Sequence, residues 1–133
     1  MRKMLLALLL AAGLFVSAWA AEFRMVNKSD LVPSAAGKVE VKHDDNGNRK
    51  VKVQVYHLAD PEKLTPARSA YMVWLQPKDK DPEPLGTLKV DKDLKGELEG
   101  TTPYKVFSVL VTAEENPKTE RPEGTEILHA DVE

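Results

Sequence analysis

Two runs of alternating valines, one on each side of an Asn-Gly pair, constrain the fold more than any other sequence feature. In Lys38–His43 (KVEVKH) the valines alternate with charged residues, and Arg49–Leu58 (RKVKVQVYHL) repeats the pattern. A period of two residues places the valines on one face of a β-strand and the polar residues on the other. Asn46-Gly47 tolerates the positive φ that a hairpin turn requires. The sequence therefore predicts a β-hairpin with one buried face and one solvated face.

Two further stretches predict strands at the centre of a sheet. Ser69–Gln76 and Tyr104–Ala113 both carry apolar side chains on two faces, which is typical of a strand covered on both sides. In the first stretch, Met72 and Trp74 lie on one face, and the opposite face carries Tyr71, Val73 and Leu75. Tyr71 or Trp74 could belong to a recognition surface, but apolar neighbours on both faces favour a core position for both.

The rest of the chain supplies short strands between frequent turn signals. Strands are expected at Glu22–Asn27, Leu85–Val90, Glu97–Glu99 and Thr125–Val132, the last of them at a sheet edge. All nine prolines fall between the predicted strands, as expected because proline cannot donate to a β-ladder. The pattern predicts an all-β fold, an immunoglobulin-like antiparallel β-sandwich of seven to eight strands, with a small barrel as the alternative.

The first twenty residues have the three parts of a secretory signal peptide. Arg2 and Lys3 are basic, Met4–Val16 is apolar, and Ser17–Ala20 supplies small residues for cleavage before Ala21. The apolar run is shorter than the roughly 20 residues that span a bilayer, so cleavage is favoured over an uncleaved membrane anchor. We therefore expect residues 1–20 to be removed and the protein to be periplasmic or secreted.

The remaining residues, 21–133, are expected to form a single β-sandwich domain. Loss of Arg2 and Lys3 leaves 17 basic residues against 21 acidic ones, a net charge of −4. A mildly acidic chain with interspersed charges lacks the basic patch of a nucleic-acid-binding or membrane-surface protein. The chain has no cysteine, which excludes disulfides, thiolate nucleophiles and cysteine metal ligands. Stability must then come from the apolar core.

Residues Tyr71–Val132 contain an ordered set of motifs. They are Tyr-x-x-Trp-Leu, a polar loop with prolines, Leu-Gly-Thr at the start of a strand, an Asp-rich turn, and a strand that ends in Val-Thr-Ala-Glu. This order resembles the extracytoplasmic C-terminal domain of the anti-sigma-K factor family. The matching residues are Tyr71, Trp74, Leu75, Leu85, Gly86, Val111, Thr112 and Glu114. The resemblance implies a similar β-sandwich and a similar extracytoplasmic compartment.

The chain also departs from that family in ways that concern function. Family members carry a cytoplasmic sigma-binding segment and a membrane helix before this domain, whereas here a predicted signal peptide leads almost directly into β-structure. Glu115-Asn116-Pro117 stands where the family has paired glycines. The resemblance therefore implies a fold and a compartment, but it does not imply that this chain regulates a sigma factor.

Neither the histidines nor the Asp-rich turn predicts a metal site. Counting outward from Asn46-Gly47 pairs His43 with Lys50, which leaves His57 seven residues away, or about 23 Å at 3.3 Å per residue. A zinc site needs three or four ligands, and His129 alone cannot complete one. Asp44–Asn48 has oxygen ligands for calcium but lacks the distal glutamate of a helix-loop-helix site, and turn chemistry accounts for its composition. No metal and no cofactor is expected.

The sequence shows no constellation for catalysis. None of the serines lies in a Gly-x-Ser-x-Gly elbow, and the scattered glycines form no phosphate-binding loop. The candidate nucleophiles are Ser29, Ser34, Ser69 and Ser108, the last of them in mid-strand. A nucleophile needs a positioned base, and no such pair is evident. We expect that the protein is not an enzyme and has no catalytic residues.

Taken together, these features predict an exported, non-catalytic β-sandwich that binds another protein of the cell envelope. Contact is expected through the loops Pro77–Pro84 and Glu114–Gly124, or along an exposed edge strand. The alternative is a periplasmic protein that binds a small ligand or a metal. A hydrolase with an unrecognised site is a third hypothesis.

Overall fold

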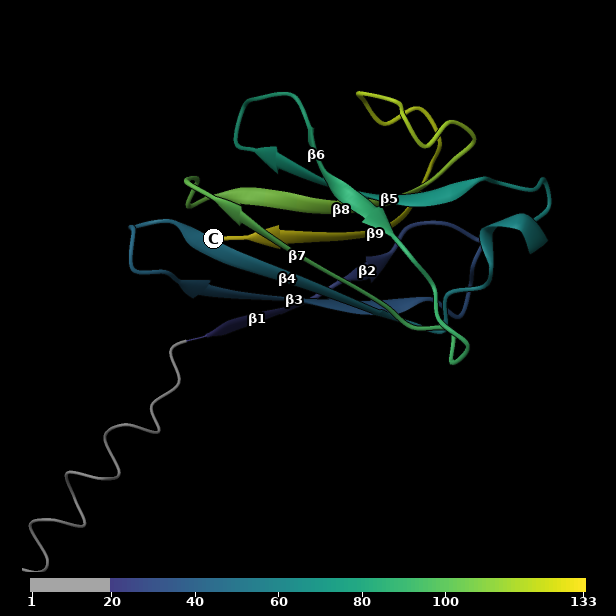
Figure 1. Ribbon diagram of the computed structural model, residues 1–133, viewed down its shortest axis with the longest axis horizontal. Coiled ribbons are helices and arrows are strands. Elements are labelled where there is room, and N and C mark those ends of the chain that lie inside the picture. The colour runs from purple at the N-terminus through teal and green to yellow at the C-terminus, as the bar shows by residue number, and fades with distance from the viewer. Residues whose placement is uncertain (1–19) are drawn as a thin grey trace, which may run out of the picture.

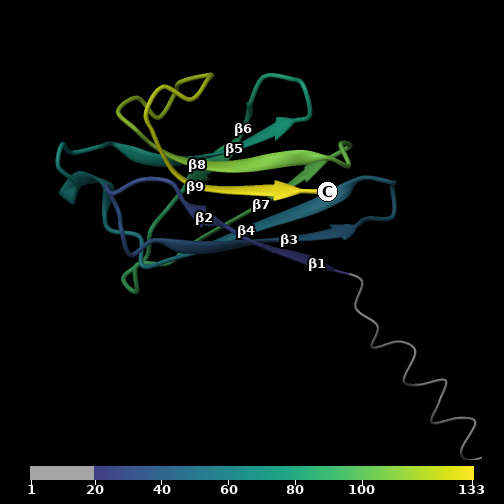
Figure 2. The same cartoon turned by 180° about the vertical axis from the view of Figure 1, so that it is seen from behind.

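The computed structural model describes residues 20–133, which form two antiparallel β-sheets packed face to face (Figures 1 and 2). One sheet has the order β1-β3-β4-β7 and the other the order β2-β9-β8-β5-β6. The strands are β1 (Ala21–Arg24), β2 (Val26–Asn27), β3 (Ala36–His43), β4 (Arg49–Tyr56), β5 (Ala70–Pro77), β6 (Glu83–Leu88), β7 (Gly96–Thr102), β8 (Phe107–Glu114) and β9 (Thr125–Val132). The predicted signal peptide lies outside the described residues, apart from Ala20. In the described part of the chain, no helix has the length and apolarity needed to cross a membrane.

The predicted all-β antiparallel sandwich is confirmed, with nine strands rather than seven or eight. The order β9-β8-β5-β6 matches the G-F-C-C′ order of a variable-type immunoglobulin sheet. The opposite sheet differs, because β3 and β4 form a hairpin within it. Two separate sheets, rather than one closed sheet, set the structure apart from the alternative of a small barrel.

The prediction of one strand at Glu22–Asn27 was wrong, because the chain changes sheets inside this stretch. β1 pairs with β3 in the four-stranded sheet, whereas β2 pairs with β9 in the five-stranded sheet. Met25 lies between them, is buried, and donates its backbone N–H to the carbonyl of Gly37 at 2.9 Å. The edge position predicted for Thr125–Val132 was also wrong, since β2 pairs with β9 and is itself the edge strand of this sheet.

The predicted hairpin is confirmed, but its register differs from the prediction by one residue. Lys50 pairs with Lys42, and His43 pairs with Arg49. The Asp44 carboxylate accepts the backbone N–H groups of Asn46 and Asn48 at 2.8 and 2.9 Å, and Gly47 has a φ of 80°. These features define a three-residue loop with a left-handed last residue instead of the two-residue turn that Asn-Gly usually forms.

β5 is a central strand, as predicted, with β8 on one side and β6 on the other. Its inner face contributes Tyr71, Val73 and Leu75 to the main core between the sheets. Its outer face carries Met72 and Trp74, which pack with Leu110 of β8 into a second, smaller apolar cluster. Both aromatic residues are fully buried, which confirms the core interpretation. β8 begins only at Phe107, and Val106, which was predicted to lie in this strand, is 44% exposed.

Tyr71 ties the connection between β4 and β5 to the core. Its hydroxyl donates a hydrogen bond of 2.5 Å to the carbonyl of Ala59, next to the short 3-10 helix η2 (Pro61–Lys63). Burial raises the pKa of Tyr71 to about 12, with a smaller contribution from the negative charge of Asp60. The neutral phenol is therefore the form that the folded protein stabilises.

Tyr71→Phe should lower the free energy of unfolding by about 1 kcal/mol near pH 7, because the Ala59 carbonyl loses its donor. The raised pKa makes the contribution of Tyr71 complete below about pH 10, the unfolded value, and it is lost as the pH rises toward 12. Urea denaturation of both proteins between pH 7 and pH 11.5 should show the difference shrinking above pH 10. A difference that stays constant over this range would contradict the assignment.

Candidate functional site

The two loops predicted to make contacts stand on the same side of the molecule. The loop between β5 and β6 and the loop between β8 and β9 both rise from the outer face of the five-stranded sheet (Figures 1 and 2). The first follows Pro77, at one end of β5, and the second follows Glu114, which pairs with Ala70 at the other end of β5. The outer cluster of Met72, Trp74 and Leu110 belongs to the same face.

A buried carboxylate anchors the β8–β9 loop to that outer cluster. Glu114 is 1% exposed, and its carboxylate accepts the Thr112 hydroxyl at 2.5 Å and the backbone N–H of Gly124 at 2.8 Å. The N–H of Glu123 lies 3.3 Å from both of its oxygens. The Thr112 hydroxyl accepts in turn the indole N–H of Trp74 at 2.8 Å. A continuous hydrogen-bonded chain, named here the Trp74–Glu114 network, thus connects the cluster to the loop.

The loop itself, Glu115–Gly124, is also tied internally. The Thr119 side chain is largely buried, and its hydroxyl lies 2.6 Å from the Glu123 carboxylate and 2.7 Å from the Arg121 carbonyl. The chain returns so close to β8 that a Cβ atom on Gly124 would collide with the Ala113 carbonyl oxygen. These contacts give the loop a defined path although it contains no regular secondary structure.

The β5–β6 loop is held by the segment between β7 and β8. The Lys80 ammonium lies 4.9 Å from the centre of the Tyr104 ring and 3.2 Å from its hydroxyl. The backbone N–H of Lys78 donates to the carbonyl of Val106 at 3.2 Å, and the Gln76 amide donates to the Lys80 carbonyl at 3.2 Å. This loop is therefore ordered too, while Lys78 and Val106 remain exposed at its side.

The histidines are not brought together. His43 ends β3, and His57 follows β4 at the opposite end of the same hairpin, as the sequence predicted. On β9, His129 contacts Glu126 at 2.7 Å through Nδ1 and Asp131 at 2.9 Å through Nε2. The ring lies between these carboxylates, and residues 20–133 contain no group of three such side chains that could hold a metal ion.

Ser108 joins His129 in an arrangement that the sequence did not reveal. The Ser108 hydroxyl donates to Asp131 Oδ1 at 2.7 Å, the same oxygen that His129 contacts. Serine, histidine and carboxylate are the residue types of a hydrolytic triad, but here the carboxylate lies between the other two. A general base must itself contact the nucleophile, so in this geometry the imidazole is not placed to take the proton of Ser108. The cross-strand pair of Ser108 and Asp131 could have been found only with the β8–β9 register known.

The carboxylates around His129 should shift its titration. Partial burial lowers the pKa of the ring, but hydrogen bonds with Asp131 and Glu126 outweigh this effect, and the pKa is raised. The pKa of Asp131 is lowered by the Ser108 hydroxyl and by His129. The stability gained from charged His129 is therefore complete below about pH 6.5 and is lost as the pH rises through the folded pKa.

Titration of the imidazole by NMR should give a pKa above 6.5 for His129 in the folded protein. Asp131→Asn should lower that pKa, because the charged ring loses one of its two carboxylate partners. Asp45→Asn, in the β3–β4 loop, serves as the control and should leave it unchanged. An unaltered His129 pKa in the Asp131 variant would contradict the contact.

No protein-family model and no curated protein sequence matches this chain. The resemblance to the anti-sigma-K factor family thus continues to rest on the motif residues alone. Three of these residues, Trp74, Thr112 and Glu114, form the Trp74–Glu114 network, so their spacing in the sequence has a structural role in this fold. A structural role of this kind does not indicate what activity the protein has.

Proposed function

We propose that this chain is an exported, non-catalytic binding module that recognises another protein of the cell envelope through the Pro77–Pro84 and Glu114–Gly124 loops. One observation carries the proposal: both loops stand on one face of the five-stranded sheet, and each is fixed by specific contacts. The proposal of export to the periplasm or the outside of the cell is supported by the signal-peptide pattern of Met1–Ala20.

Ordered loops on a rigid sheet favour recognition. Binding must offset the entropy lost when interface segments become fixed, and segments that are fixed beforehand lose less. Glu114 orders one loop, and the contact between Lys80 and Tyr104 orders the other. Loops held on a stable scaffold are also where binding residues are most often found.

The chemistry of the loops favours a polar and reversible contact. Both loops carry exposed charges of both signs, among them Lys78, Asp79, Asp81, Glu115, Lys118, Glu120 and Arg121. In residues 20–133 the exposed large apolar side chains, Val26, Leu94 and Val106, come from three different parts of the chain. Obligate interfaces are typically large and apolar, whereas polar interfaces are typical of transient partners. The partner should therefore present a charged surface to this face.

Crosslinking in the intact envelope followed by purification of the chain should capture one defined protein. The double variant Lys78→Glu and Arg121→Glu should reduce this capture about tenfold, if each loop charge contributes about 0.7 kcal/mol. Lys92→Glu, in the turn between β6 and β7, is the matched control and should leave the capture unchanged. Equal capture by the wild-type chain and the double variant would reject the loop assignment.

A further inference from the structure

The outer face of the four-stranded sheet carries a regular arrangement of charges, part of which is paired. Lys38 contacts Glu22 at 3.0 Å and Glu40 at 3.3 Å, and Lys52 contacts Glu97 at 3.0 Å. Hydrogen bonds with these glutamates raise the pKa of both lysines. In this part of the face, both lysines are therefore paired with glutamates.

Lys42 and Lys50 break the pattern. They lie directly opposite each other on β3 and β4, a position in which like charges destabilise a sheet. No carboxylate of residues 20–133 lies within ion-pair distance of either ammonium group. Thr101 of β7 is the next residue across the sheet from Lys50, is exposed, and makes no side-chain hydrogen bond within the described chain. Lys42, Lys50 and Thr101 thus form a row across the sheet, with two cations and a hydroxyl that have no side-chain partner within residues 20–133.

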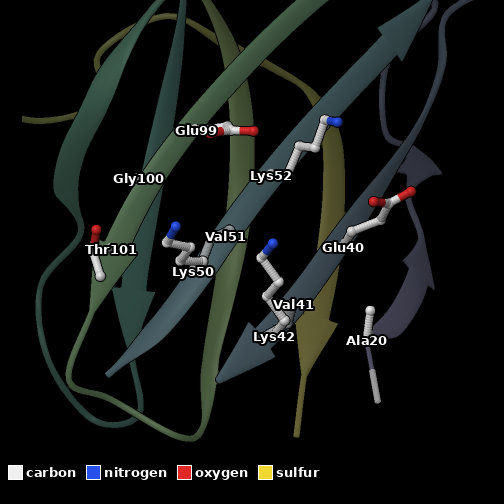
Figure 3. A pocket seen from close by; sticks show the side chains of 10 residues that line it. All are labelled: Ala20, Glu40, Val41, Lys42, Lys50, Val51, Lys52, Glu99, Gly100 and Thr101. Carbon is white, nitrogen blue, oxygen red and sulfur yellow. The ribbon is translucent and has the colours of Figure 1, made fainter. Parts of the chain in front are cut away.

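This row borders a hollow of about 340 Å³, near the lower limit of the usual size of small-molecule sites, about 300–1,000 Å³. Figure 3 shows Thr101, Lys50 and Lys42 in one row across the sheet, with both lysine side chains turned the same way. Glu99, Lys52 and Glu40 form the neighbouring row. The hollow therefore has a cationic side and a side that also carries carboxylates.

We propose that this hollow binds a compact oxyanion, a phosphate or sulfate group, between the ammonium groups of Lys42 and Lys50 and the hydroxyl of Thr101. An anion in this place would relieve the repulsion between the two lysines and would accept charge-assisted hydrogen bonds from both. The site lies on the opposite sheet from the two loops, so it is a second function, independent of the proposed protein contact.

The surroundings of the row set the size of the ligand. Glu40 and Glu99 flank the lysines, so an extended polyanion would run into two carboxylates after its first contact. The net charge of the chain is also negative, which disfavours nucleic acid and anionic membranes. A single tetrahedral group, free or carried by a small molecule, meets the two lysines without reaching those carboxylates.

Backbone amide NMR of the purified protein, titrated with sodium phosphate at pH 7 and constant ionic strength, tests the proposal. Saturable shifts are expected at residues 42, 50 and 101, with a dissociation constant on the order of 1–10 mM for so exposed a site. Sodium sulfate should compete with phosphate. Glycerol phosphate, a phosphate monoester, is titrated in parallel. Tighter binding of the ester than of free phosphate would indicate that the natural ligand is a small molecule that carries a phosphate group.

Lys42→Gln and Lys50→Gln should each weaken phosphate binding at least about fivefold, because each removes one charged donor. Lys92→Gln, in the turn between β6 and β7 and away from the hollow, is the matched control and should retain the wild-type affinity. Both lysines are exposed, so the variants should fold. Shifts that grow linearly without saturation, shifts that sodium chloride reproduces, or equal affinity in all three variants would each overturn the proposal.

Discussion

Trp74→Ala should lower the free energy of unfolding by about 3–5 kcal/mol, the usual effect of removing a large buried aromatic side chain. Trp74 is fully buried although it lies on the outer face of β5, where it packs with Met72 and Leu110. Its removal would empty the centre of this cluster and leave the Thr112 hydroxyl without its donor. Urea denaturation followed by circular dichroism measures the loss without relying on tryptophan fluorescence.

Trp74→Phe separates the two contributions of this side chain. Phenylalanine keeps most of the apolar volume but cannot donate to Thr112, so the expected loss is smaller, about 1–2 kcal/mol. A loss below about 1 kcal/mol for Trp74→Ala would mean that the outer cluster contributes little, since buried large-to-small substitutions seldom cost so little.

Glu114→Ala is expected to lower the free energy of unfolding by about 3 kcal/mol, because several donors lose a charged acceptor at once. The donors are the Thr112 hydroxyl and the backbone N–H groups of Glu123 and Gly124. The effect should be concentrated in the loop that Glu114 anchors. Trypsin should therefore cleave after Lys118 faster in the variant than in the wild-type chain, as local opening becomes easier.

Glu120→Ala provides the matched control for Glu114→Ala. Glu120 is a glutamate in the same loop, but it is exposed and accepts no hydrogen bond within residues 20–133. Its removal should change the stability by less than about 0.5 kcal/mol. If both variants resist trypsin equally, the loop is held by contacts other than the Trp74–Glu114 network. If the proposed function is correct, Glu114→Ala should also weaken capture of the partner protein.

Local periodicity was sufficient to predict the strands in which each face lies in one environment along its whole length, either the core or solvent. The alternating valines of β3 and β4 are buried on one face, as predicted. The apolar residues on both faces of β5 correctly placed it at the centre of a sheet. In these strands the side-chain pattern and the tertiary surroundings agree, so the sequence alone is informative.

The features missed depend on contacts between distant residues. Phe23 and Met25 alternate as in one strand, and only pairing with β3 and β9 shows that the chain changes sheets between them. A charged residue such as Glu114 is expected to be exposed, and its burial depends on N–H groups about ten residues further on. Both features arise from tertiary structure that no local window contains.

The candidate anion site depends on the type of turn between β3 and β4, because the turn sets the register of the two strands. A two-residue turn would place Lys50 opposite His43, and no pair of opposed lysines would be expected. The three-residue loop shifts the register by one and places Lys50 opposite Lys42. Turn type is set by the Asp44 side chain and by the φ of Gly47, neither of which the Asn-Gly pair specifies alone.

The change of sheets at Met25 has a consequence for the timing of folding. β2 pairs only with β9. Val26 lies opposite His129, so the two paired residues come from opposite ends of the domain's sequence. Contacts between residues so far apart in sequence form late, because a long loop must close before they contribute. The five-stranded sheet therefore stays incomplete until β9 has been synthesised.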